Sequence, residues 1–232
     1  MLFRSLNPTQ AMSFYVKTYL ERDIRQIINI KDLSKFEIFI KICAGRTGQV
    51  LNYSALASEI GIDSKTAKQW INVLEASFII KILNPFYKNL NKRFTKSPKL
   101  YFLDIGLVCY LLSIKNPQQL QAHPLFGSLF ETYVVSEVLK SYFNNIEEPP
   151  LYYYRDLRGQ EIDLIFDHIT HINQIEIKSS QTYQKSFTKG LTYLKKSNYI
   201  IQKSGLIYGG NNSQKLNNLH LFSWRNIADI LF

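Results

Sequence analysis

The stretch that decides the fold reads Leu151-Tyr-Tyr-Tyr-Arg-Asp-Leu-Arg-Gly-Gln-Glu-Ile-Asp163 and continues, after a short gap, with Gln174-Ile-Glu-Ile-Lys178. Aromatic and β-branched residues that alternate with polar ones predict three strands here, over residues 151–154, 161–166 and 174–178. Helices are expected on either side, at residues 128–143 and 185–195, with a further strand at 205–208. Because helices and strands alternate around a mixed sheet, this half of the chain is predicted to be α/β.

Several charged side chains of this region are expected to meet. Alternation along a strand places Glu161 and Asp163 on one face, and it does the same for Glu176 and Lys178. If the two strands are neighbours, Asp163, Glu176 and Lys178 converge at one end of the sheet. Glu131 lies on the preceding helix in an otherwise apolar run, where a lone charge needs a partner.

These residue types support divalent-metal chemistry. Two carboxylates side by side repel each other unless a cation lies between them, and hard oxygen ligands suit Mg²⁺. Asp163, Glu176 and Glu131 are therefore the candidate metal ligands and, with Lys178, the candidate catalytic residues. Lys178 would orient or deprotonate a water molecule, or stabilise charge at a scissile phosphate. The alternative is a structural ion-pair cluster without activity.

Residues 53–76 have the pattern of a helix-turn-helix. Ala57 is a small residue that lets the second helix approach the first, and Gly61 makes the turn between them. Apolar residues line the inner face of the second helix. Its outer face carries basic and amide side chains, namely Lys65, Lys68, Gln69 and Asn72. Such a face can meet phosphates and base edges in a major groove, whereas the alternative is a module that only contacts protein.

The charge of the chain favours a polyanionic partner. The net charge is +10, and it is unevenly placed: residues 1–99 hold 16 basic and 7 acidic residues, whereas residues 100–232 hold 12 and 11. A basic N-terminal half suggests that the chain binds nucleic acid, and the alternative is a basic surface that is only solvated.

Strands are expected at residues 78–83 and 99–103. The basic connector between them contains Lys92 and Arg93 and is predicted to act as a wing on the DNA backbone.

The acidic motif resembles the PD-(D/E)XK nuclease-like superfamily, with an acid on a helix (Glu131), an Asp on a strand (Asp163) and Glu-x-Lys on the next (Glu176 to Lys178). More broadly, residues 10–225 resemble the C-terminal region of bacterial AAA-type ATPases that carry the domain of unknown function 4143. The segments that carry this resemblance are Lys17-Thr-Tyr-Leu-Glu-Arg-Asp-Ile-Arg25, Ala44-Gly-Arg-Thr-Gly-Gln-Val-Leu-Asn52, Thr66-Ala-Lys-Gln-Trp-Ile-Asn-Val-Leu-Glu-Ala76, Lys96-Ser-Pro-Lys-Leu-Tyr-Phe-Leu-Asp-Ile-Gly106, His123-Pro-Leu-Phe-Gly127, Tyr154-Arg-Asp156, Glu161-Ile-Asp163, Ile175-Glu-Ile-Lys-Ser179, Tyr208-Gly-Gly210 and Trp224.

The resemblance implies two domains and an α+β chain overall. Residues 1–98 would comprise a remnant of the ATPase's lid helix followed by a winged helix-turn-helix. Residues 99–232 would form a restriction-endonuclease-like domain, a mixed sheet flanked by helices.

The phosphate-binding loop of such ATPases is missing from the sequence. That loop needs Gly-x-x-x-x-Gly-Lys-Ser/Thr, and Gly45-Arg-Thr-Gly48 is too short and lacks the lysine. No ATP site is therefore expected in this chain. The leading hypothesis is a DNA-binding protein with a nuclease-like, Mg²⁺-dependent phosphodiesterase domain. The alternatives are a non-catalytic DNA- or protein-binding module and a regulatory part of an ATPase subunit supplied elsewhere.

The cysteines and the apolar runs of the sequence bear on the cellular compartment. Cys43 and Cys109 lie far apart in apolar surroundings and are predicted to be buried free thiols, which favours a reducing compartment. The N-terminus lacks the apolar stretch of a signal peptide, and no run reaches the roughly 18 apolar residues of a membrane span. We expect a cytoplasmic protein.

Overall fold

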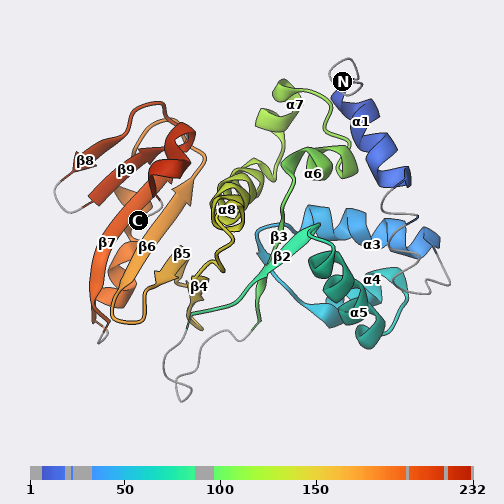
Figure 1. Cartoon of the computed structure of the whole chain (residues 1–232), viewed down its shortest axis with the longest axis horizontal. Helices are drawn as coiled ribbons and strands as arrows, with labels where there is room; N and C mark the ends of the chain where they lie inside the picture. The colour runs from blue at the N-terminus through green and yellow to red at the C-terminus, as the bar shows by residue number, and fades with distance from the viewer. Residues whose placement is uncertain are drawn as a thin grey trace. The chain divides into compact units, whose positions relative to one another are not determined.

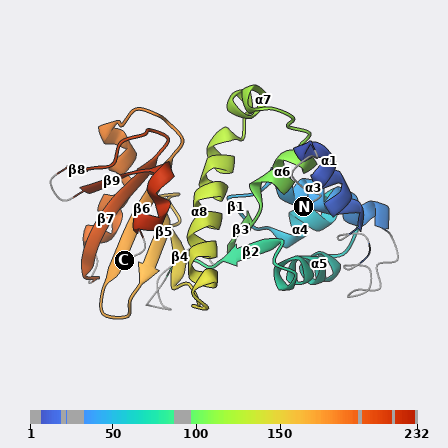
Figure 2. The same cartoon turned by 45° about the horizontal axis from the view of Figure 1, so that its top comes forward.

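The computed structural model describes residues 7–18, 22, 33–86, 97–196, 199–216 and 219–230 (Figures 1 and 2). The chain divides into two compact units. Unit 1 consists of Met1–Ile82 and Leu100–Leu129, and unit 2 consists of Leu83–Lys99 and Phe130–Phe232. The domain boundary expected between residues 98 and 99 stays a prediction.

Unit 1 is mainly helical. Its helices are α1 (Pro8–Tyr15), α3 (Leu33–Gly45), α4 (Tyr53–Ile60), α5 (Ser64–Ala76), α6 (Ile105–Leu111) and α7 (Pro117–Ala122). Three short strands form a sheet in the order β1 (Gln49–Val50), β3 (Lys99–Phe102), β2 (Ile80–Leu83). In the core, the centre of the Trp70 ring lies 5.2 Å from the centre of the Phe36 ring and 5.1 Å from that of Phe39. Both contacts are edge-to-face, the arrangement that aromatic rings prefer.

The predicted helix-turn-helix is confirmed in α4 and α5. Gly61 ends α4 with a φ of 69°, in the left-handed region that glycine adopts without strain. Asp63 then caps α5 by accepting hydrogen bonds from the backbone N–H and the hydroxyl of Thr66. The inner face of α5 is buried, and its polar face, Lys65, Lys68, Gln69 and Asn72, is exposed as predicted.

Unit 2 contains a six-stranded mixed sheet. Its strands are β4 (Leu151–Arg155), β5 (Glu161–Asp167), β6 (Ile172–Lys178), β7 (Ile201–Tyr208), β9 (Leu219–Ser223) and β8 (Gln214–Leu216), in that spatial order. β4, β5 and β6 pair antiparallel, β6, β7 and β9 pair parallel, and β8 pairs antiparallel with β9. The long helix α8 (Phe126–Asn144) runs beside β4 and β5 in both views. The chain is therefore α+β overall, a helical region followed by a mixed sheet, as the sequence predicts.

One predicted helix of unit 2 differs from the structure. Residues 185–195 form two 3₁₀ segments, η3 (Lys185–Thr188) and η4 (Gly190–Lys196), and not one α-helix. The break falls before Gly190, whose backbone packs so closely on β6 that a Cβ there would lie 1.8 Å from Oε1 of Glu176. The residue pattern predicts neither strands β8 and β9 nor the 3₁₀ segment η5 (Trp224–Ile230) that follows them in the chain.

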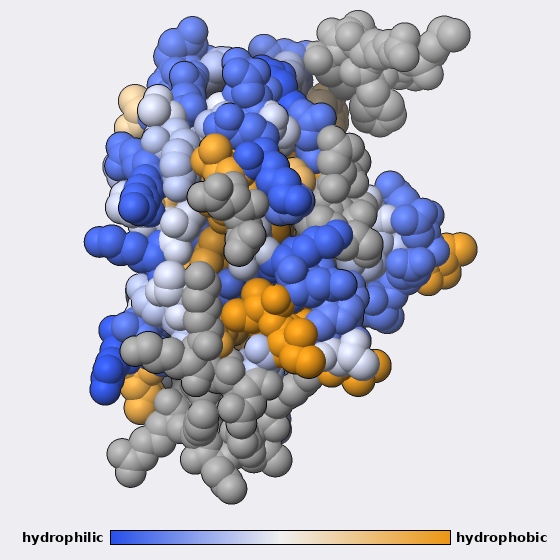
Figure 3. Space-filling view, turned by 90° about the vertical axis from the view of Figure 1, so that its left-hand side faces the viewer, coloured by the Kyte–Doolittle hydropathy of each residue, from blue (hydrophilic) through white to orange (hydrophobic). Residues whose placement is uncertain are grey.

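The side of the chain that carries β7 to β9 faces the viewer in Figure 3. Hydrophilic side chains cover much of the coloured surface there, and apolar side chains gather in a few patches. Within the described ranges, no helix combines the length and the apolar character that a membrane crossing requires.

Several sequence predictions fall outside the described residues. Lys92 and Arg93, with the rest of the expected wing, lie in the segment 87–96, and most of the expected lid-helix remnant lies in residues 19–32. Both cysteines are free: Cys43 is buried as predicted, whereas Cys109 is only partly buried.

Candidate metal centre

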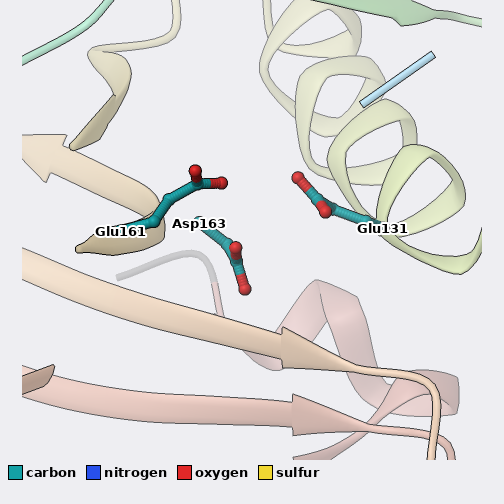
Figure 4. Close-up of side chains that lie close together, drawn as sticks. All are labelled: Glu131, Glu161 and Asp163. Atoms are coloured by element: carbon teal, nitrogen blue, oxygen red, sulfur yellow. The ribbon is translucent and has the colours of Figure 1, made fainter. Parts of the chain in front are cut away.

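Three carboxylates of unit 2 converge at the beginning of β5. Glu161 and Asp163 lie two residues apart on this strand and so share one of its faces. Glu131 projects toward them from the first turns of α8 (Figure 4). One oxygen from each residue lies within 4.8 Å of the others. This spacing gives three hard oxygen donors in one place, the type of ligand that divalent cations such as Mg²⁺ take.

Asp163 is the most constrained of the three. Its Oδ2 accepts the backbone N–H of Ile177 at 2.7 Å and lies 3.1 Å from Nζ of Lys178. Burial alone would raise the pKa of Asp163, but the ammonium groups of Lys178 and Lys99 outweigh it and hold that pKa below its usual value. Asp163 is therefore ionised at neutral pH.

Glu176 lies beside Asp163 on the neighbouring strand. Leu164 pairs with Ile175 across β5 and β6, which places Asp163 next to Glu176. Burial, followed by the charge of Asp163, raises the pKa of Glu176 to about 8. Glu176 is consequently mostly protonated at neutral pH, and Lys178 donates a 2.8 Å hydrogen bond to its Oε2.

Lys178 is held as a cation. Burial would lower its pKa, but Asp163 and Glu176 outweigh that effect and raise the pKa above its usual value. Of the roles that the sequence suggested for Lys178, the structure therefore favours charge stabilisation over proton abstraction from water.

A second lysine, the first residue of β3, enters the centre. Lys99 is 2% exposed, and its Nζ lies 3.0 Å from Oε1 of Glu131 and also forms an ion pair with Glu161. Arg155 of β4 contacts the other oxygen of Glu161 at 3.1 Å. With Glu176 protonated, the centre holds three carboxylates (Glu131, Glu161, Asp163) against three cations (Lys99, Arg155, Lys178).

The four site residues expected from the sequence come together. Glu131 and Asp163 join the carboxylate cluster, and Glu176 is joined to Asp163 through the shared partner Lys178. The cluster's third member is Glu161, which strand alternation had placed on the face of Asp163 without assigning it a role. Lys99 and Arg155 had no signal in the sequence that linked them to the carboxylates. The ligand and catalytic roles of these residues stay predictions.

The fold and the centre define an α+β protein with a helix-turn-helix unit and a sheet unit that carries a partly buried carboxylate cluster. Residues 126–227 match the family model described as "Domain of unknown function (DUF4143)", and residues 4–118 match "Domain of unknown function (DUF8612)". The DUF4143 match includes all four acidic residues of the centre. The separate match of the N-terminal part was not anticipated by the resemblance, which treated residues 10–225 as one family region.

The relatives are uncharacterized proteins. One is from Mycobacterium tuberculosis and another from Mycobacterium bovis, each 29% identical to this chain over 169 residues. The matched part is 72% of this chain but only 37% of each relative, so the chain spans little more than a third of the length of the curated relatives it matches.

The raised pKa of Glu176 predicts a pH-dependent loss of stability. Between its ordinary value of 4.5 and about 8, the folded state keeps a proton that the unfolded state has released, so the wild type loses stability as pH rises through this window. The glutamine of Glu176→Gln cannot ionise, so this variant does not lose stability with pH through this group. In chelator-treated protein, we expect the melting temperature of Glu176→Gln minus that of wild type to rise between about pH 5 and pH 8 and then to level off.

Scanning calorimetry across this range tests the prediction. Glu148→Gln, at an exposed position of the same unit, controls for the loss of one carboxylate. A melting-temperature difference for Glu176→Gln that stays constant with pH would show that Glu176 is not held protonated.

Proposed function

We propose that this chain is a DNA-binding protein whose unit 2 holds a divalent cation and hydrolyses phosphodiester bonds. The observation that carries the proposal is the convergence of Glu131, Glu161 and Asp163 from a helix and a strand, with Lys178 on Asp163. The resemblance to PD-(D/E)XK nucleases implies the same chemistry for this helix acid, strand Asp and Glu-x-Lys.

The donor set fits a small divalent cation. Mg²⁺ binds carboxylate oxygens at about 2.0–2.1 Å and keeps several waters, so three carboxylates suffice to hold it. One oxygen of each carboxylate lies within 4.8 Å of the others, and modest side-chain rotation would bring all three to coordinating distance of one ion. Asp163, which is ionised and fixed by the Ile177 amide, is the anchor of the set.

In hydrolysis, the carboxylates and Lys178 would have different roles. A bound divalent cation supplies a Lewis acid for a phosphate oxygen and lowers the pKa of a coordinated water. Glu131, Glu161 and Asp163 would hold the ion. Lys178, which remains protonated, would stabilise the negative charge that develops on the scissile phosphate.

The outer face of α5 would supply the DNA contacts. Lys65, Lys68, Gln69 and Asn72 are exposed together on the second helix of the helix-turn-helix. Lysines in such a position neutralise phosphates, whereas the amides can reach base edges. Mg²⁺ as the metal, DNA as the substrate and Lys92 and Arg93 as further phosphate contacts are parts of this proposal.

Cleavage assays test the catalytic part. We expect the wild type to cut labelled single-stranded, duplex or branched DNA in Mg²⁺ or Mn²⁺, and Asp163→Asn to lose about a hundredfold or more of this activity because the ionised anchor of the ion is gone. Lys178→Ala should lose a similar amount through the missing charge at the phosphate.

Glu148→Gln, purified in parallel, is the matched control and should cut like the wild type, since Glu148 is exposed and outside the cluster. Cleavage that persists in both Asp163→Asn and Lys178→Ala would come from another site or from a contaminant and would contradict the assignment.

Salt titrations of DNA affinity test the binding part. Each phosphate contact contributes about 0.9 to the slope of log K against log salt, so Lys65→Ala/Lys68→Ala should lower the slope by about 2 and weaken binding to all sequences alike. Lys41→Ala/Lys115→Ala removes the same charge from exposed positions of unit 1 outside α5 and is the control. Equal slopes for the two double variants would exclude α5 as the DNA-binding face.

A non-catalytic module is the second candidate, and Lys99 is the observation that favours it. Its ammonium already lies between Glu131 and Glu161, and the cations of the centre balance the carboxylates without a metal ion. Under this candidate the centre only stabilises unit 2, and the chain binds DNA or regulates an ATPase subunit supplied elsewhere. Absence of cleavage, together with DNA binding that depends on α5, would favour this second candidate.

A further inference from the structure

The ammonium group of Lys99 lies between two of the carboxylates that would bind the metal ion. Lys99 is the last residue of the segment Leu83–Lys99 that unit 2 includes ahead of α8. Its side chain is 3% exposed, and Nζ contacts the carboxylates of both Glu131 and Glu161. An ammonium group buried between two carboxylates occupies the kind of position in which a divalent cation binds.

Contacts with Tyr153 hold Lys99 in this place. Tyr153 is fully buried on β4, and Nζ of Lys99 lies 5.4 Å from the centre of its ring. The Tyr153 hydroxyl donates a hydrogen bond to the carbonyl of Ser97, two residues before Lys99. The backbone of Tyr153 also pairs with the other end of the segment, through the Asn84 carbonyl and the Phe86 amide. Both ends of the segment are thus fixed on one residue of the sheet.

We propose that Lys99 is a displaceable internal cation of the metal centre: its ammonium takes the place between Glu131 and Glu161, and a divalent ion binds only by moving it away. This inference rests on the proposed metal site. It makes Lys99 a residue that sets metal affinity, distinct from Lys178, whose ammonium contacts Asp163 and Glu176.

Removal of the Lys99 charge gives a specific expectation. Lys99→Met keeps most of the length of the side chain but leaves Glu131 and Glu161 without this cation, so a metal ion no longer competes with an ammonium group for them. Mn²⁺ alone, titrated by calorimetry or by electron paramagnetic resonance, should bind Lys99→Met about tenfold or more tightly than wild type. Lys99→Arg, which retains the charge, should bind Mn²⁺ as weakly as wild type.

Thermal stability gives an independent readout. In chelator, Lys99→Met should melt below wild type, because two carboxylates in a buried site lose a partner. Mn²⁺ should raise the melting temperature of Lys99→Met by more than it raises that of wild type. The double variant Lys99→Met/Glu131→Gln should lose the added Mn²⁺ response, since it lacks one of the two carboxylates.

The outcomes separate the inference from the metal site itself. Equal and measurable Mn²⁺ affinity in wild type and Lys99→Met overturns the inference and leaves the metal site in place. No Mn²⁺ binding by either protein at millimolar concentration overturns both. If Lys99→Met does not fold in chelator, Lys99→Gln, which is neutral but still donates hydrogen bonds to the carboxylates, replaces it in the titration, and the same comparison with wild type decides.

Discussion

Burial of two adjacent acidic side chains, Asp163 and Glu176, is the constraint on which the rest of unit 2 depends. Asp163 is 6% exposed, and an isolated carboxylate in such surroundings would be strongly disfavoured. The structure meets this cost by bringing cations from three separate strands: Lys99 from β3, Arg155 from β4 and Lys178 from β6. The removal of one partner from such a set leaves a buried charge uncompensated, which typically costs more than the intact pair contributes.

The same constraint explains the local structure around β6. The backbone amide of Ile177 donates to Asp163, so that this N–H is satisfied by a side chain. The side chain of Glu176 packs against the backbone of Gly190, where a Cβ would not fit. Its pKa of about 8 keeps Glu176 mostly neutral at neutral pH. The two adjacent acids thus avoid repulsion because only one of them is charged at neutral pH.

Strand periodicity was sufficient to predict much of this site. The pattern from Glu161 to Asp163 and from Glu176 to Lys178 gave the strands and the shared faces, and the lone charge of Glu131 on an apolar helix indicated a buried partner. The role of Lys99 could not be predicted, because its contact with Glu131 joins residues 32 positions apart, and the periodicity of a single strand does not show which distant side chain it meets. The break between η3 and η4 was missed for a related reason: the close approach of Gly190 to β6 is a tertiary packing effect that local helical propensity does not report.

The two units carry separate parts of the proposed function. The helix-turn-helix of unit 1 presents a basic and amide face, whereas unit 2 holds the carboxylates, and the chain passes between the units at residues 82–83, 99–100 and 129–130. Under the proposal, the charge of the outer face of α5 would set the affinity for phosphates, and the charge balance of the centre would set the affinity for the metal ion. Because the two depend on different residues, single substitutions can separate them.

The most direct measurement of the central claim is anomalous diffraction from crystals of the wild-type chain soaked in Mn²⁺. An ion in the centre should give an anomalous peak at coordinating distance from Glu131, Glu161 and Asp163, with Nζ of Lys99 moved away from the two glutamates. A difference map that shows Lys99 still between Glu131 and Glu161, with no anomalous peak at the cluster, would contradict the proposal and identify the centre as a permanent ion-pair cluster.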